Sequence, residues 1–319
     1  MANTTDGLLY QAREEMMAFA FVSVGSCCAF LYINCVLLFT LRSRPVFCET
    51  SRYILLFNLL LADTAQLTLS ETLYLLAACR IRLTLYLCSV LVMTSMLVAS
   101  ISPLTLMVMS VERYVAVCLP LRHAEIVTIR STAVAVTTIW VFSLVNILIR
   151  IFILLNLKHD ILSSQPMRHF CSKEAFFFAP MSYYYDKAYS GFVFISVGMT
   201  IILSYIGVML VARSASTDKA SAIKAGKTLL LHLIQLGLIL PSTIHSVILT
   251  LLAITADKLL VVRLHNIFFV ICHILPRCLS ALIYGLRDQT IRHVLMSYFS
   301  CQQKCSVFPT NANTNCMLE

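Results

Sequence analysis

Long blocks of hydrophobic residues alternate with polar segments along this chain. Seven predominantly apolar segments, each longer than 20 residues, are separated by short segments that hold most of the charged residues. A helix needs about 20 apolar residues to cross roughly 30 Å of hydrocarbon, and continuous apolar runs do not suit membrane-spanning strands. The pattern predicts an all-α membrane protein, a bundle of seven transmembrane helices. The segments are Phe19–Leu41, Tyr53–Cys79, Leu83–Val111, Ser131–Leu157, Ala188–Ala212, Thr228–Ala256 and Leu264–Leu286.

Composition supports the same class. Of the 319 residues, 59% are hydrophobic and only 12% are charged, too few polar groups to cover a soluble domain of this size. The net charge of +9 raises the alternative of a nucleic-acid partner. The basic residues lie between the apolar runs, however, where anionic lipid headgroups are the expected partner. We therefore expect membrane lipids and no nucleic acid, and one receptor domain over residues 19–287.

The charges between the segments predict the orientation. With the N-terminus outside, the cytoplasmic segments carry thirteen Lys and Arg residues and the extracellular ones nine, as the positive-inside rule requires. Asn3 begins an Asn-Thr-Thr acceptor for glycosylation, which is used only on the lumenal side. The prediction is a multi-pass plasma-membrane protein with an extracellular segment at 1–18.

The last segment, 288–319, is predicted to be cytoplasmic. Within it, Ile291, Leu295 and Phe299 share one face of an amphipathic stretch, which predicts a short helix lying on the inner leaflet. Cys301 and Cys305 follow it, either as palmitoylation sites or as plain cytosolic thiols.

A charged motif ends the third apolar segment. Glu112-Arg113-Tyr114 follows 29 uncharged residues, and such a segment is costly to keep at a bilayer edge, so we expect it to have a function. The motif resembles the cytoplasmic end of the third helix in rhodopsin-like G-protein-coupled receptors. The chain as a whole resembles odorant receptors, particularly those of fish type, over roughly residues 19–300. Further matching positions are Asn34, Asp63, Pro120–Ile126, Trp140, Ser204, Tyr205, Lys224, Ala225, His232, Leu233 and Ile283–Asp288.

This resemblance implies several roles. Cys88 and Cys171 correspond to the disulfide that joins the third helix to the second outer loop. A small odorant would bind outside, and a heterotrimeric G protein of the olfactory, cyclic AMP type would be activated inside. Glu112 would hold the guanidinium of Arg113 until activation, when Tyr205 and Tyr284 would reorganise around it; Tyr114 completes the motif. Leu121 would contact the G protein.

Simpler interpretations of these positions remain open. A lone arginine at the end of an apolar helix can extend to the lipid headgroups without any switching role. The loop around Leu121 can equally pack against the ends of the spans. The chain also departs from the family in the seventh span, where Ser280-Ala281-Leu282-Ile283-Tyr284 replaces Asn-Pro-x-x-Tyr. The acid found midway along the third span in mammalian odorant receptors is Ser102 here.

Two ionisable residues of different spans are predicted to pair. Asp63 resembles the acid that binds sodium in many rhodopsin-like receptors, while Arg277 replaces a residue that ordinarily lies near that acid. We expect a buried ion pair in place of sodium, acting either as a moving switch or as a purely structural tie.

The ligand pocket is predicted, by resemblance, among the outer halves of spans three, five, six and seven. A mostly apolar site with a few hydrogen-bonding groups suits a small organic molecule, although each residue alone is equally at home in a helix-packing core. An amine held by the usual acid is disfavoured, because Ser95 occupies that position. The candidate residues are Ser95, Met96, Ala99, Ser100, Tyr189, Phe192, Ser196, Thr243, Ile244 and His273.

Other classes fit the sequence less well. No paired carboxylates, metal-binding cluster, nucleophile motif or phosphate loop is evident, so we expect neither an enzyme nor a cofactor or metal. Inverted repeats and a pore stripe, typical of transporters and channels, are not evident either. The alternative is a rhodopsin-like receptor for another small molecule or a lipid, and the sequence leaves open whether the protein forms a homo-oligomer.

Overall fold

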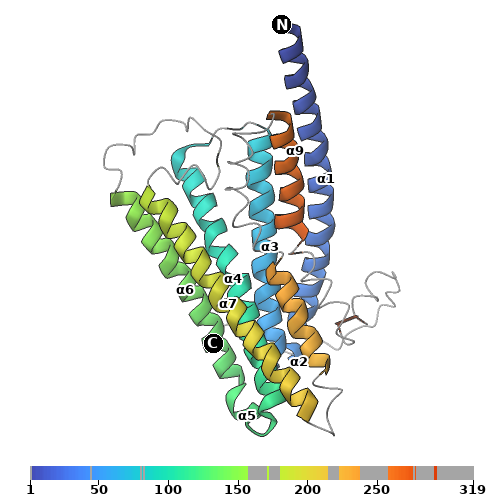
Figure 1. Cartoon of the computed structure of the whole chain (residues 1–319), viewed down its shortest axis with the longest axis vertical. Helices are drawn as coiled ribbons and strands as arrows, with labels where there is room; N and C mark the ends of the chain where they lie inside the picture. The colour runs from blue at the N-terminus through green and yellow to red at the C-terminus, as the bar shows by residue number, and fades with distance from the viewer. Residues whose placement is uncertain are drawn as a thin grey trace, which may run out of the picture.

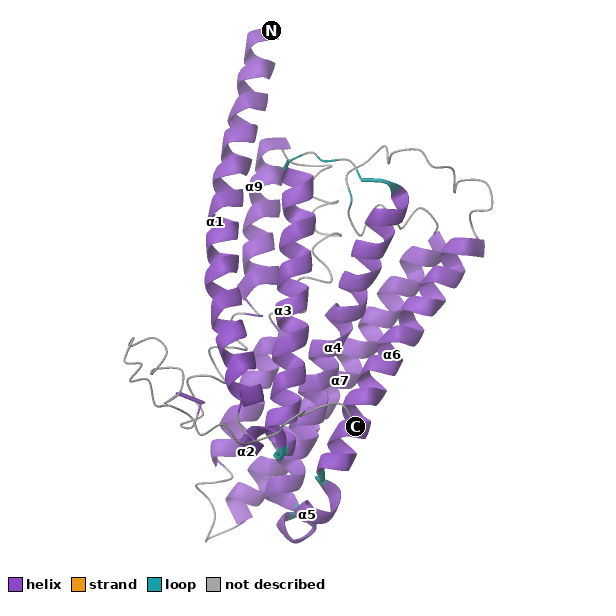
Figure 2. Cartoon of the chain, turned by 180° about the vertical axis from the view of Figure 1, so that it is seen from behind, coloured by secondary structure: helices purple, strands orange, loops and turns teal. Residues whose placement is uncertain are grey.

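The computed structural model describes residues 2–43, 45–79, 81, 83–156, 171, 180–214, 223–237, 258–275, 277 and 291–292. Nearly all of these residues are helical, and the long helices run side by side as a bundle (Figure 1). Figure 2 shows helices and loops but no strand in this part of the chain. The helices are α1 (Ala2–Ser43), α2 (Pro45–Cys48), α3 (Ser51–Ala78), α4 (Leu85–Cys118), α5 (His123–Ile126), α6 (Ile129–Asn156), α7 (Pro180–Ser214), an unlabelled helix over 223–237, and α9 (Lys258–Phe269), which continues as a π-helical turn over Val270–Ile274.

Five of the described helices are long and apolar enough to cross a membrane. They agree with the first five predicted spans and differ from them by a few residues at most ends. The sixth predicted span is described only over 228–237, and the seventh only over 264–275 and at 277. The spanning segments are Met17–Ser43, Ser51–Ala78, Tyr86–Cys118, Ile129–Asn156 and Met181–Val211.

The N-terminal segment is helical as well. Helix α1 begins at Ala2 and continues without a break into the first span, so that its first turns project beyond the other helices (Figure 1). Asn3 lies on this extension, and its glycosylation stays a prediction. Below, the two ends of the bundle are named by the orientation that the sequence predicts.

Helix α4 packs against α3, α6 and α7 and so forms the centre of the bundle. Its Ile101 and Leu106 are fully buried, together with Leu59 of α3 and Ile201 of α7. Large apolar side chains elsewhere, such as Phe21, point outwards and are exposed. In a membrane such side chains face lipid, which is why these helices are apolar on all sides.

Polar side chains tie the first half of the bundle together. The indole Nε1 of Trp140 donates to Oδ1 of Asn58 at 2.9 Å, and Nδ2 of Asn58 donates to Thr105 Oγ1 at 2.9 Å. These two hydrogen bonds connect α6, α3 and α4 at one level. Because a buried amide is stable only when it is hydrogen-bonded, this chain of contacts fixes how the three helices face one another.

Candidate functional site

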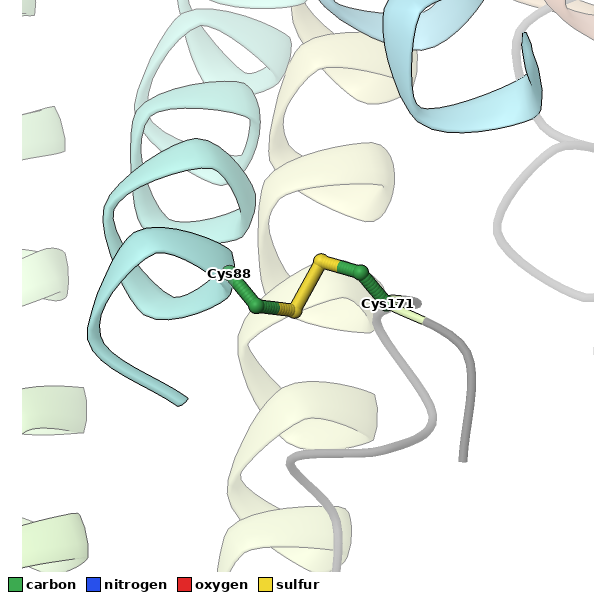
Figure 3. Close-up of a disulfide and its surroundings, with 2 residues drawn as sticks. All are labelled: Cys88 and Cys171. Atoms are coloured by element: carbon green, nitrogen blue, oxygen red, sulfur yellow. A yellow bond between two sulfur atoms is a disulfide. The ribbon is translucent and has the colours of Figure 1, made fainter. Parts of the chain in front are cut away.

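A disulfide fixes the extracellular end of α4. Cys88, in the first turn of α4, is bonded to Cys171, with an S–S distance of 1.97 Å and a Cα–Cα distance of 5.6 Å (Figure 3). Both cysteines are buried, against Val92 and neighbouring apolar side chains. The pair suggested by the resemblance is therefore the pair that the structure joins. The disulfide holds Cys171 of the second outer loop against the extracellular end of α4.

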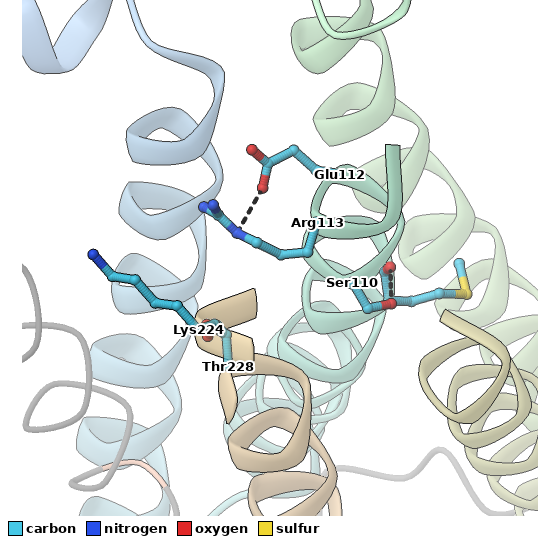
Figure 4. Close-up of polar contacts among 6 residues, drawn as sticks. Ser110, Glu112, Arg113, Lys224 and Thr228 are labelled. Atoms are coloured by element: carbon cyan, nitrogen blue, oxygen red, sulfur yellow. Dashed lines mark hydrogen bonds and ion pairs between the residues drawn. The ribbon is translucent and has the colours of Figure 1, made fainter. Parts of the chain in front are cut away.

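The cytoplasmic end of α4 carries an ion pair between neighbouring residues. Nε of Arg113 lies 3.2 Å from Oε2 of Glu112 (Figure 4). The Glu112 side chain is 9% exposed and that of Arg113 19%. Because a guanidinium keeps its charge at any accessible pH, Arg113 is held locally by Glu112 rather than extended freely to the headgroups.

Three helices close around this motif. Val208 of α7 and Ala225 and Leu229 of the 223–237 helix form one buried cluster, which Val117 of α4 and Tyr205 of α7 join. Figure 4 draws Lys224 of that helix in the same region as Arg113. The cytoplasmic ends of these helices are therefore packed together, at the end of the bundle where Arg113 is bound to Glu112.

Two glycines permit this close packing. A Cβ on Gly207 of α7 would lie 2.5 Å from Cε2 of Tyr114, a distance at which something must shift. A Cβ on Gly226 would lie 2.9 Å from the sulfur of Met209, a flexible side chain that can move aside. The ring of Tyr114 thus packs directly on the backbone of α7, so that the third residue of the motif acts as a spacer between the two helices.

The loop after the motif presents an apolar side chain to solvent. Pro120–Arg122 forms a 3-10 turn with no buried residue, and Leu121 is 95% exposed. Leu121 therefore does not pack against the ends of the spans in this structure. Its contact with a G protein stays a prediction.

Asp63 and Arg277 are both buried, with exposed fractions of 0% and 4%. Ser102 donates its hydroxyl hydrogen to Oδ1 of Asp63 at 2.6 Å, so the residue that replaces the usual acid of span three serves as a partner for the acid of span two. The ion pair between Asp63 and Arg277 stays a prediction.

The structure brings several candidate ligand residues together in the outer half. Ser100 is buried, and its hydroxyl lies 2.7 Å from that of Ser143 on α6; Tyr189 of α7 lies beside it. Ser95 accepts a hydrogen bond from Gln66 of α3 at 3.1 Å. The remaining partly buried candidates are Met96, Ala99 and Ser196.

One candidate points the wrong way for a pocket. Phe192 is 61% exposed, on the outer face of α7, whereas the following Val193 is 4% exposed. Helix α7 is apolar on nearly every side, so its sequence gives no periodic signal for the buried face. Four more candidate positions cannot be placed: Thr243, Ile244, Tyr284 and the side chain of His273 lie outside the described residues.

The outer half also holds a buried ion pair that the sequence did not predict. Nη2 of Arg150 on α6 lies 2.9 Å from Oδ1 of Asp186 on α7, with side chains 6% and 3% exposed. Nε of Arg150 also donates to Asn146 at 3.2 Å, and the guanidinium lies 5.2 Å from the ring centroid of Tyr185 and 5.7 Å from that of Tyr189. Arg150 lies within the fourth predicted span, but the fifth span was predicted to begin at Ala188. Asp186 was therefore counted as a loop residue.

Comparison with known proteins supports the bundle of transmembrane helices. Residues 17–301 match the 7 transmembrane receptor (rhodopsin family), which covers most of the chain. The chain belongs to this family of seven-transmembrane receptors, and it is thus a multi-pass membrane receptor and not an enzyme. It is 31% identical over 273 residues to Odorant receptor 131-2 of Danio rerio, an alignment covering 85% of this chain and 82% of that protein. Within the family it is a homologue of an odorant receptor of fish.

Proposed function

We propose that this chain is an odorant receptor that binds a small organic ligand in the outer half of the bundle and activates a heterotrimeric G protein at the cytoplasmic end. The N-terminus lies outside. The name of the zebrafish relative supports the sensory role, and the membership of the rhodopsin family supports coupling to a G protein.

The closed cytoplasmic end is the observation that carries the coupling proposal. Arg113 is bound to Glu112 at 3.2 Å, and at the same end of the bundle α7 and the 223–237 helix make an apolar contact. Outward movement of that helix would break the small cluster at Val208 and Leu229 and expose Arg113. A terminal helix of the G protein would then bind there, next to the exposed side chain of Leu121.

The ligand would act by preferring the open arrangement. A ligand shifts a two-state equilibrium only by as much as its affinity for the two states differs. Contacts near Ser100 and Tyr189 connect α4, α6 and α7, and α4 and α7 continue to the cytoplasmic junction. A ligand that changes the packing of α7 against α4 in the outer half would thereby change the same contact at Tyr114 and Gly207.

The test is a cyclic AMP assay in cells that also express an olfactory-type stimulatory G protein. Pooled water-soluble and volatile odorants are applied to the wild type and to Arg113→Ala, with surface level measured by an N-terminal epitope tag. A response that is lost in Arg113→Ala at equal surface level supports the proposal. A response only to other small molecules or lipids would favour the alternative receptor class. Equal responses of the two proteins would contradict coupling through Arg113.

A further inference from the structure

A second group of buried polar side chains lies in the outer half, between α1, α3 and α9, which stand side by side in Figures 1 and 2. Ser23 of α1 donates to Oε2 of Glu71 on α3 at 2.7 Å. One turn further along α3, the hydroxyl of Tyr74 donates to Oδ1 of Asn266 on α9 at 2.9 Å. The exposed fractions of these four residues lie between 1% and 7%. None of them is among the candidate ligand residues of α4 and α7.

This group has unused hydrogen-bonding capacity. Oε1 of Glu71 and Nδ2 of Asn266 are buried and have no hydrogen-bond partner among the described residues. Among the described residues, the Ser23 hydroxyl is the one hydrogen-bond donor to the Glu71 carboxylate. A buried acid without a cation is costly in a membrane, and such residues mark sites where an ion or a ligand binds.

The group lies about two helical turns from the extracellular ends of α3 and α9. Glu71 lies seven residues before the end of α3 at Ala78, about 10 Å along the helix axis. Asn266 lies eight residues after the start of α9 at Lys258, about 12 Å along its axis. The two residues therefore lie at nearly the same level, well inside the extracellular end of each helix.

The surroundings suit a cation with an apolar body. The rings of Tyr74 and Phe269 are stacked, with centroids 4.3 Å apart and an interplanar angle of 13°, and Leu67 packs in the same apolar cluster. Aromatic faces attract ammonium groups when water is excluded, and apolar neighbours bind an alkyl chain. A carboxylate beside stacked rings therefore suits an alkylammonium ion: the carboxylate binds the charged group, and the rings and apolar side chains contact the alkyl chain.

We propose that Glu71 anchors a protonated amine, whose ammonium group binds Oε1 while its apolar body packs against Tyr74 and Phe269. An amine bound through span three is disfavoured because Ser95 stands where amine-binding receptors carry their acid; Glu71 supplies an acid on a different helix. This site would give the proposed odorant receptor a class of ligand, and any cellular response to the amine rests on that proposed function. Binding of the amine is measurable without a G protein.

The experiment measures thermal unfolding of the purified full-length receptor in lipid nanodiscs at pH 7. The probes are hexylamine, hexanol and hexanoate at equal concentrations, up to the millimolar range. The variants are the wild type, Glu71→Gln, and Glu125→Gln as a control at an exposed cytoplasmic acid. We expect hexylamine alone to raise the midpoint of the wild type. Its apparent affinity should fall at least tenfold in Glu71→Gln and stay unchanged in Glu125→Gln.

Three results would overturn the site. These are equal shifts with hexanol, no shift with hexylamine, or an undiminished hexylamine shift in Glu71→Gln. Should Glu71→Gln fail to fold, Phe269→Leu takes its place. It keeps the carboxylate, removes the aromatic face and should weaken hexylamine about three- to tenfold; an unchanged affinity would contradict the site. A thermal shift without a cyclic AMP response would count against the coupling proposal and leave the amine site intact.

Discussion

The ion pair between Arg150 and Asp186 offers the most quantitative test of how the outer half is held together. Its closest atoms are 2.9 Å apart and its side chains are 6% and 3% exposed. At an effective dielectric constant of about 20, two unit charges 4 Å apart attract by about 4 kcal/mol. Removing one partner from a buried pair leaves an uncompensated charge, which costs about 3–5 kcal/mol. We therefore expect Asp186→Leu to lower the free energy of unfolding by at least about 3 kcal/mol.

The loss is measured as the thermal midpoint of purified receptor in nanodiscs and as surface level in cells. On the scale known for domains of 150–250 residues, a loss of about 3 kcal/mol lowers the midpoint by roughly 6–12 °C. Arg150→Met should lower it by a similar amount, because it leaves Asp186 buried without a cation. Arg213→Met, at the exposed end of α7, is the control and should change the midpoint little.

The double variant Arg150→Met with Asp186→Leu decides the cause. Replacing a buried ion pair by apolar side chains of similar volume is often neutral or stabilising, so the double variant should recover most of the lost stability. A double variant whose loss equals the sum of the two single losses would refute the argument. So would single losses below about 1 kcal/mol, the range of exposed pairs.

Three further outcomes are expected. Gly207→Ala should raise basal cyclic AMP, because the new methyl group pushes α4 and α7 apart at the motif, whereas Gly191→Ala, with open space around its Cβ, should not; equal basal levels would contradict the spacer role. Cys88→Ser should reduce surface level strongly, since a disulfide across a separation of 83 residues stabilises a chain by about 4–5 kcal/mol; normal expression would argue against this. Asp63→Arg and Arg277→Asp should each lower surface expression and together restore it, and failure of that rescue would exclude the predicted pair.

Hydropathy predicted the five spanning helices that the structure describes in full, because crossing a bilayer imposes a minimum apolar length on each. It could not predict that α1 starts at Ala2, because a helix that continues into water needs no apolar composition. For the same reason, hydropathy did not place Asp186 within a helix. The helix turn that carries it is polar enough to look like a loop, although the residue is buried against Arg150.

Which face of each helix is buried was harder to predict. Ser100 and Tyr189, two residues of the predicted pocket, lie beside each other. Phe192 was expected in the same pocket but points outwards, and an apolar helix in lipid has no polar face to mark its exposed side. Hydrogen bonds between spans, such as that from Ser102 to Asp63, depend on how the helices are rotated and cannot be read from spacing within one helix.

The most direct test of the central claim measures nucleotide exchange on a purified heterotrimeric G protein. The receptor is reconstituted in nanodiscs with an odorant that is active in cells, and binding of a non-hydrolysable GTP analogue is followed for the wild type and Arg113→Ala. The account predicts odorant-dependent acceleration by the wild type and exchange at the receptor-free rate with Arg113→Ala, at equal odorant binding. Acceleration by both proteins, or by neither, would contradict a receptor that acts through Arg113.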